Sequence, residues 1–476
     1  MRLSTLTLPF ALLLASCAPP ADSGDTDNGE GGSGEGGSGA SAQTGSAGDG
    51  GSAQGGSAQG GSAQGGSAQG GGGQGGTAGT GGQGGSTGTG GGAGEAKRII
   101  GYFVAWGVYG RDYHVADIPA DKLTHVNYAF ANISPEGECV LGDPYADTDK
   151  FYPGDTWDPG AKRGSFHQLE ILKSQHPHLR TLISVGGWSW SGKFSDVALT
   201  EASRAKFVSS CVKFMKDWSF DGIDIDWEYP VSGGLPENKY RPEDKQNYTL
   251  LLQDFREALD AESAATGKTY DLTIAAPAGP GIYANIELAK VASALSWINL
   301  MAYDFHGGWD PATNFNAALH ASSGDPSADP DVKTKLNSAS AVEGYLAAGV
   351  PADKLVLGVP FYGRGYANVS GNNKGLFQPF SGLPTGTWEA GIFDYHDLAA
   401  NYVPKMTRSW HEEAMVPWLY DAATGVMISY DDPESIQKKA DYIQQKSLGG
   451  AMFWELSGDT ADSALLSVLH TSLGKD

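Results

Sequence analysis

The chain has 476 residues and a formal net charge of −23, with 55 acidic residues against 32 lysines and arginines. This acidic balance argues against nucleic acid or an anionic membrane surface as a partner, because both carry the same sign of charge. The balance is compatible with a neutral or cationic polymer, and it favours solubility.

The N-terminus predicts an export signal with a lipid attachment site. Arg2 supplies the positive charge of such a signal, and residues 6–15 form an apolar segment too short to span a bilayer. The run Leu14-Ala15-Ser16-Cys17 resembles a bacterial lipobox, which implies a signal peptide of residues 1–16 and a lipid on the Cys17 sulfur. An ordinary secretory signal with an incidental cysteine is the alternative.

Residues 17–96 predict a linker. From position 22 onward they are almost all Gly, Ser, Ala, Gln and Thr, with four copies of Gly-Gly-Ser-Ala-Gln between Gly50 and Gln69. Such a segment has no apolar surface to offset its chain entropy, so we expect a flexible coil with a reach of about 45–50 Å. Because Ala18 rather than Asp follows the cysteine, we expect an exported lipoprotein of the outer membrane or cell surface, or its released form.

Residues 97–476 predict an α/β fold, a (β/α)8 TIM barrel. Eight short apolar runs rich in β-branched residues alternate with longer helical stretches, as in parallel βαβ units. A doubly wound open sheet is the alternative, but it gives no reason for eight strands. The runs are Ile99–Trp106, Leu123–Phe130, Thr181–Gly187, Gly222–Trp227, Leu272–Ala278, Trp297–Tyr303, Leu355–Phe361 and Gly450–Glu455. The helical stretches include Glu201–Trp218, Pro242–Ala261, Ser340–Ala348 and Pro433–Lys446.

An α+β insertion domain is predicted at residues 361–430, between the seventh and eighth barrel strands. This interval is longer than the others and contains short aromatic and turn segments such as Thr385-Gly-Thr-Trp388 and Val416-Pro-Trp418-Leu-Tyr420. An insertion that follows the C-terminal end of a barrel strand lies on the face where barrel enzymes bind substrate.

The run from Asp221 to Pro230 places acids at alternate positions of the fourth predicted strand. Asp224, Asp226 and Glu228 share one face, because side chains of a strand alternate between faces. Neighbouring acids raise one another's pKa, and a protonated acid beside ionised carboxylates is the equipment for cleaving a glycosidic bond. A divalent-metal site or a charged edge strand is the alternative, although calcium loops place Gly and polar residues, not Ile and Trp, between their acids.

The sequence resembles a family 18 glycoside hydrolase, a chitinase with an α+β insertion domain. Four motifs carry the resemblance in the expected order: Ser184-x-Gly186-Gly187, Asp221-x-x-Asp224-x-Asp226-x-Glu228, Met301-x-Tyr303-Asp304 and Trp454. The resemblance implies hydrolysis of β-1,4 bonds in chitin or chito-oligosaccharides with retention of configuration. A chitin-binding lectin is one alternative, although such members lose the acid. A hydrolase acting on N-glycans or peptidoglycan is another.

The resemblance also implies the catalytic roles. Glu228 is expected to be the general acid, while the acetamido oxygen of the substrate serves as nucleophile. Asp226 is expected to bind the acetamido N–H, Asp224 to share a proton beneath it, and Tyr303 to donate its hydroxyl to the acetamido oxygen. Strand parity places Asp221 on the opposite face, where a hydrogen-bonding role at the strand entrance is at least as plausible as a catalytic one. We expect no cofactor or metal, and a monomer.

Further residues are expected to contact the sugar chain. Trp454 would form the floor on which the reacting sugar stacks. The other matching positions are Asp304, Met301, Tyr229, Trp188, Tyr102, Arg364 and Trp309. Additional aromatic residues that could line the groove are Tyr145, Tyr152, Trp157, Trp190 and Trp410.

Two cysteines, Cys139 and Cys211, remain in the predicted barrel. One disulfide between them is possible in an exported protein. Cys211 lies in a helical apolar stripe, which favours a buried and inert thiol.

Overall fold

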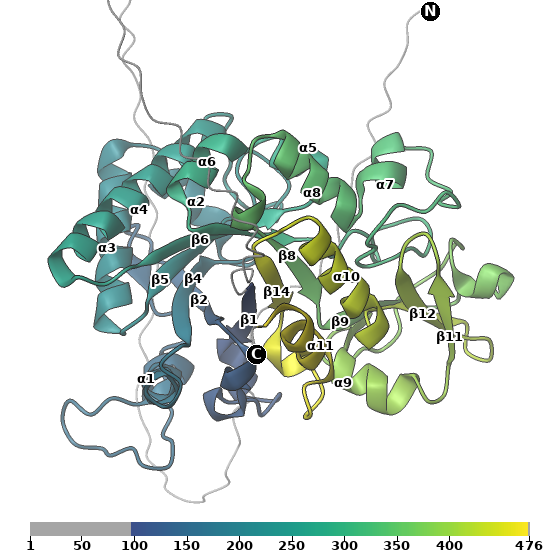
Figure 1. The fold of residues 1–476 in the computed structure, drawn as a ribbon, viewed down its shortest axis with the longest axis horizontal. Coiled ribbons are helices and arrows are strands. Elements are labelled where there is room, and N and C mark those ends of the chain that lie inside the picture. Colours follow the sequence, from purple (N-terminus) through teal and green to yellow (C-terminus); the bar gives the residue numbers. More distant parts are fainter. Residues whose placement is uncertain (1–96, 475–476) are drawn as a thin grey trace, which may run out of the picture. The chain divides into compact units, whose positions relative to one another are not determined.

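The structure, a computed structural model, describes residues 97–474. Eight parallel strands form a closed barrel, because each pairs with its neighbour and the last pairs with the first (Figure 1). Each predicted run overlaps one of these strands, so the predicted barrel is confirmed. In the order of pairing they are β1 (Arg98–Val104), β2 (His125–Ile133), β4 (Arg180–Gly186), β5 (Gly222–Asp226), β6 (Asp271–Pro277), β7 (Trp297–Met301), β8 (Leu355–Pro360) and β14 (Gly450–Trp454).

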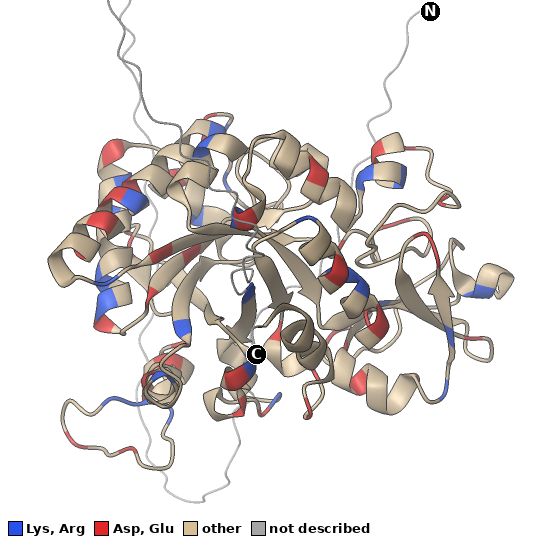
Figure 2. Ribbon diagram, in the orientation of Figure 1, with Lys and Arg blue, Asp and Glu red and all other residues tan. Residues whose placement is uncertain are grey.

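Helices cover the outside of the barrel, and most charged residues lie on these helices and on loops (Figure 2). The barrel strands are buried on both faces, which explains their nearly continuous apolar character. The longer helices are α1 (Gly164–Gln175), α3 (Glu201–Asp217), α4 (Asp244–Thr266), α6 (Leu288–Ala294), α8 (Ser338–Ala347), α10 (Pro433–Gln445) and α11 (Ala464–Leu473). Short helices are α2 (Phe194–Val197), α5 (Pro280–Tyr283), α7 (Pro330–Lys335) and α9 (Tyr395–Asp397).

The ends of the helices follow local capping chemistry. Helix α10 begins after Asp432, whose carboxylate accepts hydrogen bonds from the N–H groups of Glu434 and Ser435. Helix α4 ends five residues later than the sequence predicts. Its polar and alanine-rich C-terminal turn continues until Gly267, whose φ of 73° provides the left-handed stop that a glycine favours.

A second sheet, five-stranded and antiparallel, is inserted between β8 and β14, which confirms the predicted insertion. Its strands, in spatial order, are β10 (Ile392–Asp394), β9 (Tyr362–Tyr366), β13 (Val426–Ser429), β12 (Val416–Asp421) and β11 (Thr407–His411). The sheet has an apolar core of its own that includes Tyr366, Trp418 and Met427. Strand β9 starts only two residues after β8 ends, so the first residues of the insertion lie at the C-terminal mouth of the barrel.

Both cysteines of the barrel are buried free thiols. Cys139 lies in the two-residue strand β3 (Cys139–Val140), and its backbone N–H donates to Ser210 Oγ at 2.9 Å, next to Cys211 in helix α3. Burial raises the pKa of the Cys211 thiol well above its usual value, which fits the predicted inert thiol. Among the described residues no helix is both long and apolar enough to cross a membrane. The predicted signal peptide, Cys17 and the linker lie outside the described residues.

A buried ion pair joins the exit of the insertion to the barrel. Lys439 of α10 and Asp431, which follows β13, are both almost completely inaccessible, and the Lys439 Nζ lies 2.7 Å from the Asp431 carboxylate. Removal of one partner would leave the other as an uncompensated buried charge.

Replacement of Lys439 by methionine is expected to lower the free energy of unfolding by about 3–5 kcal/mol, since Asp431 loses its only cationic partner in the ion pair. Urea denaturation followed by circular dichroism measures the effect. Lys446→Met is a matched control in the residue that follows α10, because Lys446 pairs with Glu343 on the surface. A loss of about 1 kcal/mol or less is expected there. Equal losses in the two variants would contradict the importance of the buried pair.

Candidate active site

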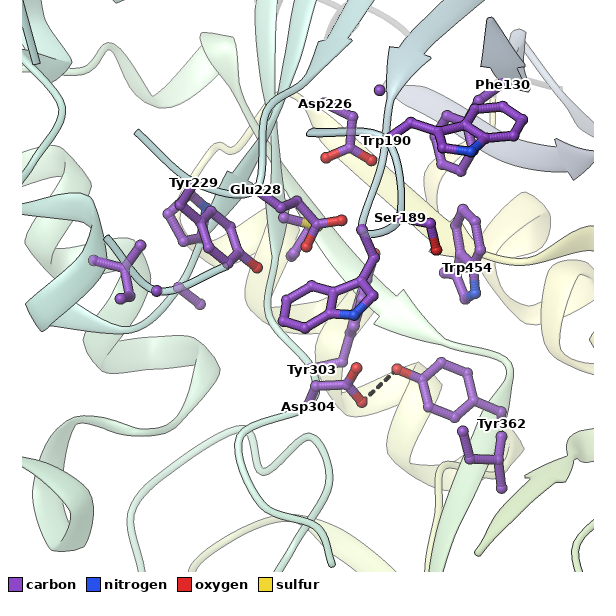
Figure 3. A pocket seen from close by; sticks show the side chains of 18 of the residues that line it. Phe130, Ser189, Trp190, Asp226, Glu228, Tyr229, Tyr303, Asp304, Tyr362 and Trp454 are labelled. Carbon is purple, nitrogen blue, oxygen red and sulfur yellow. Dashed lines mark hydrogen bonds between the residues drawn. The ribbon is translucent and has the colours of Figure 1, made fainter. Parts of the chain in front are cut away.

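A cleft of about 610 Å³ opens at the C-terminal ends of the barrel strands. Residues at the ends of β2, β4, β5, β7 and β14 line it, and strand β9 of the insertion forms part of its wall. Figure 3 shows the carboxylates of Asp226 and Glu228 in the cleft, with Tyr362 and Trp454 across from them. The lining side chains are mainly aromatic or apolar, with a few polar groups between them, as is usual for ligand sites.

Strand β5 places the three acids at increasing height toward the mouth of the barrel. Asp224 is completely buried, Asp226 is 4% exposed, and Glu228 is 9% exposed just beyond the strand end. Only Asp226 and Glu228 line the cleft, so Asp224 lies beneath its floor.

Four hydrogen bonds hold the Asp224 carboxylate. One oxygen accepts from the Tyr102 hydroxyl at 2.8 Å and from Ser184 Oγ at 2.7 Å. The other accepts from Asn299 Nδ2 at 3.2 Å and from Thr273 Oγ1. Burial raises the pKa of Asp224, whereas these donors lower it by stabilising the ionised form. The donors come from β1, β4, β6 and β7, so half of the barrel strands supply a hydrogen bond to this one carboxylate.

The two acids above Asp224 have raised pKa values. Burial raises the pKa of Asp226 well above its usual value, and the charges of Glu228 and Asp224 raise it further. The pKa of Glu228 is raised to about 7 by burial and by the charge of Asp304, while a hydrogen bond with Tyr229 lowers it. This raised pKa keeps a substantial fraction of Glu228 protonated near neutral pH, and the side chain is placed to donate the proton into the cleft.

Two buried polar atoms on the cleft wall have no hydrogen-bond partner among the described residues. One is Asp226 Oδ1, an acceptor, and the other is Trp188 Nε1, a donor. A buried polar atom without a partner is costly, so these atoms mark places where a bound ligand would be stabilised by complementary groups.

Stacked aromatic rings build one side of the cleft. Trp454 packs on Phe130 with ring centroids 5.9 Å apart and planes 19° apart, and Tyr102 and Trp106 support it at 5.5 and 6.3 Å. Gly187 makes this possible, because a Cβ at that position would come within 2.6 Å of the Phe130 ring. The absence of a side chain at Gly187 thus permits the close packing under the site.

The opposite side of the cleft joins the barrel to the insertion. Asp304, just after β7, accepts a hydrogen bond at 2.6 Å from the Tyr362 hydroxyl (Figure 3). It accepts another at 2.6 Å from Arg364 Nε, and both donors belong to strand β9. The Arg364 guanidinium also lies over the Trp309 ring at 4.7 Å. The nearby Tyr303 hydroxyl has only a weak contact with the Met452 sulfur, at 3.8 Å.

The structure brings most of the predicted site residues together. Those that line the cleft are Asp226, Glu228, Tyr303, Trp454, Asp304, Met301, Tyr229, Trp188, Arg364 and Trp309, together with Trp190. Tyr102 does not line it, because the ring is only 2% exposed and its hydroxyl is bonded to Asp224. The expected sugar contact of Tyr102 is therefore corrected to a supporting position beneath the floor. Asp221 lies at the other end of β5 and accepts a hydrogen bond from Thr181 N–H at 2.9 Å, outside the cleft.

Sequence reasoning missed several supporting residues. Thr273 and Asn299 are each the single polar residue in the apolar runs that correspond to β6 and β7. A polar residue in such a run is the one feature of the sequence that points to a buried hydrogen-bond partner. Trp106 and Phe130 stand at the ends of the first two runs, where the support they give to Trp454 had no signature in the sequence.

Some aromatic residues proposed for the groove lie outside the cleft. Tyr145 is 49% exposed and stacks on Tyr109, with centroids 6.2 Å apart, while Trp157 is 68% exposed and stacks on Phe151 at 5.2 Å. The Tyr109–Tyr145 pair lies beside the cleft rim, because Tyr109 donates a hydrogen bond to Asp143, which lines the cleft. Tyr152 and Trp410 do not line the cleft either.

The family model for the glycosyl hydrolases of family 18 matches residues 98–459, which is most of the chain and nearly all of its described part. This chain belongs to that family. It is therefore a glycoside hydrolase, and the interpretation of its acid motif as a metal site or charged edge strand is set aside. Among the described residues, no group of three or more His, Cys, Asp or Glu side chains is arranged to hold a metal ion.

The relatives of this family 18 hydrolase include named chitinases. It is 50% identical to Chitinase A1 of Niallia circulans over 404 residues, which cover 77% of this chain and 57% of that protein. It is 43% identical to Endochitinase 1 of Metarhizium robertsii over 380 residues, covering 78% of this chain and 84% of that protein. The solved structure of chitinase ChiA74 from Bacillus thuringiensis has a TM-score of 0.75 and 46% identity, covering 80% of this chain and 70% of that one.

Proposed function

We propose that this hydrolase cleaves the β-1,4 bonds between N-acetylglucosamine units of chitin and chito-oligosaccharides. The observation that carries the proposal is the pair formed by Glu228, whose pKa is raised to about 7, and Asp226, whose buried Oδ1 has no donor among residues 97–474. A substrate acetamido N–H is the donor that Asp226 Oδ1 requires, and the chitin chain repeats this group at every sugar. The names of the relatives, which are chitinases, support the same substrate.

In the first step Glu228 donates its proton to the glycosidic oxygen, and the bond between this oxygen and the anomeric carbon breaks. The acetamido carbonyl oxygen of the same sugar attacks the anomeric carbon, so an oxazolinium ion forms and the enzyme supplies no covalent nucleophile. Asp226 accepts the acetamido N–H and balances the developing positive charge. Tyr303 donates its hydroxyl to the acetamido oxygen, since within the described residues this hydroxyl makes just a weak contact with the Met452 sulfur.

In the second step water attacks the anomeric carbon from the side that the leaving group occupied. Glu228, now ionised, takes a proton from this water and returns to its starting state. The bond from the acetamido oxygen to the anomeric carbon breaks, and the acetamido group is restored. Two displacements at one carbon give retention of configuration. Asp224, fixed by its four donors, shares a proton with Asp226 during the cycle.

We further propose that the substrate is a linear polymer. The insertion raises one wall of the cleft through Tyr362 and Arg364, which favours a chain threaded along the groove. The exposed aromatic pair Tyr109–Tyr145 lies beside the rim at Asp143, where stacking on sugar rings could extend the binding track. Short products, mainly dimers, are expected from chain ends.

Glu228→Gln is expected to lower kcat on chitin oligomers by at least about 10²–10⁴-fold while their affinity is retained, because the amide cannot donate the proton. Product chromatography measures the rate, and calorimetry measures the affinity. Glu237→Gln is the matched control, since Glu237 is exposed in the loop that follows. Strong residual activity of the Glu228 variant would contradict its role as the acid, and binding without turnover by the unaltered protein would indicate a lectin. Cleavage of N-glycan or peptidoglycan substrates in preference to chitin would change the substrate class.

The activity is expected to fall as the pH rises through about 7, because only protonated Glu228 can act as acid. Asp304→Asn removes a negative charge that raises the pKa of Glu228. The basic limb of the kcat/KM profile is therefore expected to shift to lower pH. Asp331→Asn, an exposed residue of α7, serves as a control with an unchanged limb. A basic limb that stays in place in Asp304→Asn would show that this charge does not govern the acid.

We propose that the protein is anchored by a lipid at Cys17 and acts at the outer membrane or cell surface as a monomer. The lipobox-like run before Cys17 and the Gly-rich linker after it support this location. Cys17→Ala is expected to move the protein from the membrane fraction to the soluble fraction or medium, as followed by immunoblotting. Cys139→Ala is a control that keeps the lipobox. An unchanged distribution of the Cys17 variant would refute the anchor.

A further inference from the structure

The general acid stands just beyond the region that the barrel ladder holds. Strand β5 ends at Asp226, and Glu228 comes two residues later. The pairing of β5 with β4 and β6 extends no further than Asp226. The position of the Glu228 backbone must therefore be set by contacts other than the sheet.

The Ser191 hydroxyl supplies one of these contacts. It accepts a hydrogen bond from the Glu228 backbone N–H at 2.8 Å. The same hydroxyl donates toward the carbonyl oxygens of Gly187 at 2.9 Å and Asp226 at 3.1 Å. Ser191 is completely buried and does not line the cleft, so it has no access to substrate.

A second contact holds the other side of the same residue. Asn238 Nδ2 donates to the Glu228 carbonyl oxygen at 3.2 Å. The loop that carries Asn238 packs tightly here, because a Cβ on Gly234 would come within 2.1 Å of that oxygen and within 2.8 Å of Asn238 Nδ2. The Glu228 backbone is thus hydrogen-bonded on both sides by side chains of two separate segments, with Ser191 at its N–H and Asn238 at its C=O.

We infer that Ser191, assisted by Asn238, is a positioning residue that fixes the backbone of Glu228 relative to Asp226 and so aims the acid at the glycosidic oxygen. Ser191 bonds the backbone of both acids at once, through Asp226 C=O and Glu228 N–H. Loss of the Ser191 hydrogen bonds would change the distance between Glu228, which donates the proton, and Asp226, which orients the acetamido group of the substrate. Catalysis depends steeply on such geometry, whereas binding depends on the whole cleft. This inference rests on the proposed role of Glu228 as the acid.

The chain offers a matched control for this inference in Ser195. Its hydroxyl is also completely buried, and it donates to Asp244 Oδ1 at 2.8 Å and contacts Arg241. Ser195 lies in helix α2, four residues from Ser191, and its hydroxyl bonds Asp244 and Arg241 and not Asp226 or Glu228. Ser195→Ala therefore removes a buried hydroxyl from the same segment without releasing Glu228.

The test compares Ser191→Ala, Asn238→Ala and Ser195→Ala in the full-length protein with a soluble chito-oligosaccharide. Ser191→Ala is expected to lower kcat about 10–100-fold with KM changed less than about two-fold. Asn238→Ala is expected to lower kcat by a smaller factor, because its bond is longer. Ser195→Ala is expected to lower the melting temperature as much as Ser191→Ala does, with kcat unchanged per folded molecule.

Two measurements separate positioning from a loss of folding and from a failure of the proposed function. Adding Ser191→Ala to Glu228→Gln is expected to leave oligomer affinity unchanged, because the cleft keeps its shape. If Glu228→Gln is inactive but Ser191→Ala retains kcat within two-fold, the positioning inference is overturned. Equal losses of kcat in Ser191→Ala and Ser195→Ala would also overturn it. If Glu228→Gln remains active, the proposed acid itself is wrong.

Discussion

The burial of one carboxylate, Asp224, is the constraint on which the rest of the site depends. An acid inside a barrel is tolerated only if donors surround it. Tyr102, Ser184, Thr273 and Asn299 supply them from four strands, so polar side chains replace apolar ones at this level of the barrel interior. With Asp224 satisfied from below, burial raises the pKa of Asp226, and the charges of Glu228 and Asp224 raise it further. Burial likewise raises the pKa of Glu228, the acid at the top, to about 7.

The sequence predicts the barrel well because its strands are buried on both faces, and such strands appear as continuous apolar runs. Strand parity likewise places Asp224, Asp226 and Glu228 on one face, and the structure has Asp226 and Glu228 lining the cleft with Asp224 buried beneath them. Parity gives the face of a side chain but not its depth. For that reason Tyr102 was expected to touch sugar, although its ring lies beneath the floor.

Hydrogen bonds from side chains to the backbone of the catalytic residues are the hardest part of the site to predict from the sequence, because they join residues that no pattern connects. Ser191 and Asn238 look like ordinary loop residues, and only their positions in space connect them to Glu228. The support of Trp454 by Phe130 and Trp106 is similarly a matter of packing between distant segments. The state of the two cysteines needed the structure too, since seventy residues of chain separate two thiols that the fold places in adjacent elements.

The hydrogen bonds from strand β9 to Asp304 allow the insertion to influence the pKa of Glu228 as well as the shape of the cleft. Tyr362 and Arg364 fix the carboxylate whose charge raises the pKa of Glu228. Both side chains belong to the inserted sheet. Substitutions in that sheet can therefore change the pH range in which the enzyme is active, while every residue of strand β5 stays the same. The insertion is thus a place where evolution, or an engineer, can adapt the pH range separately from the reaction itself.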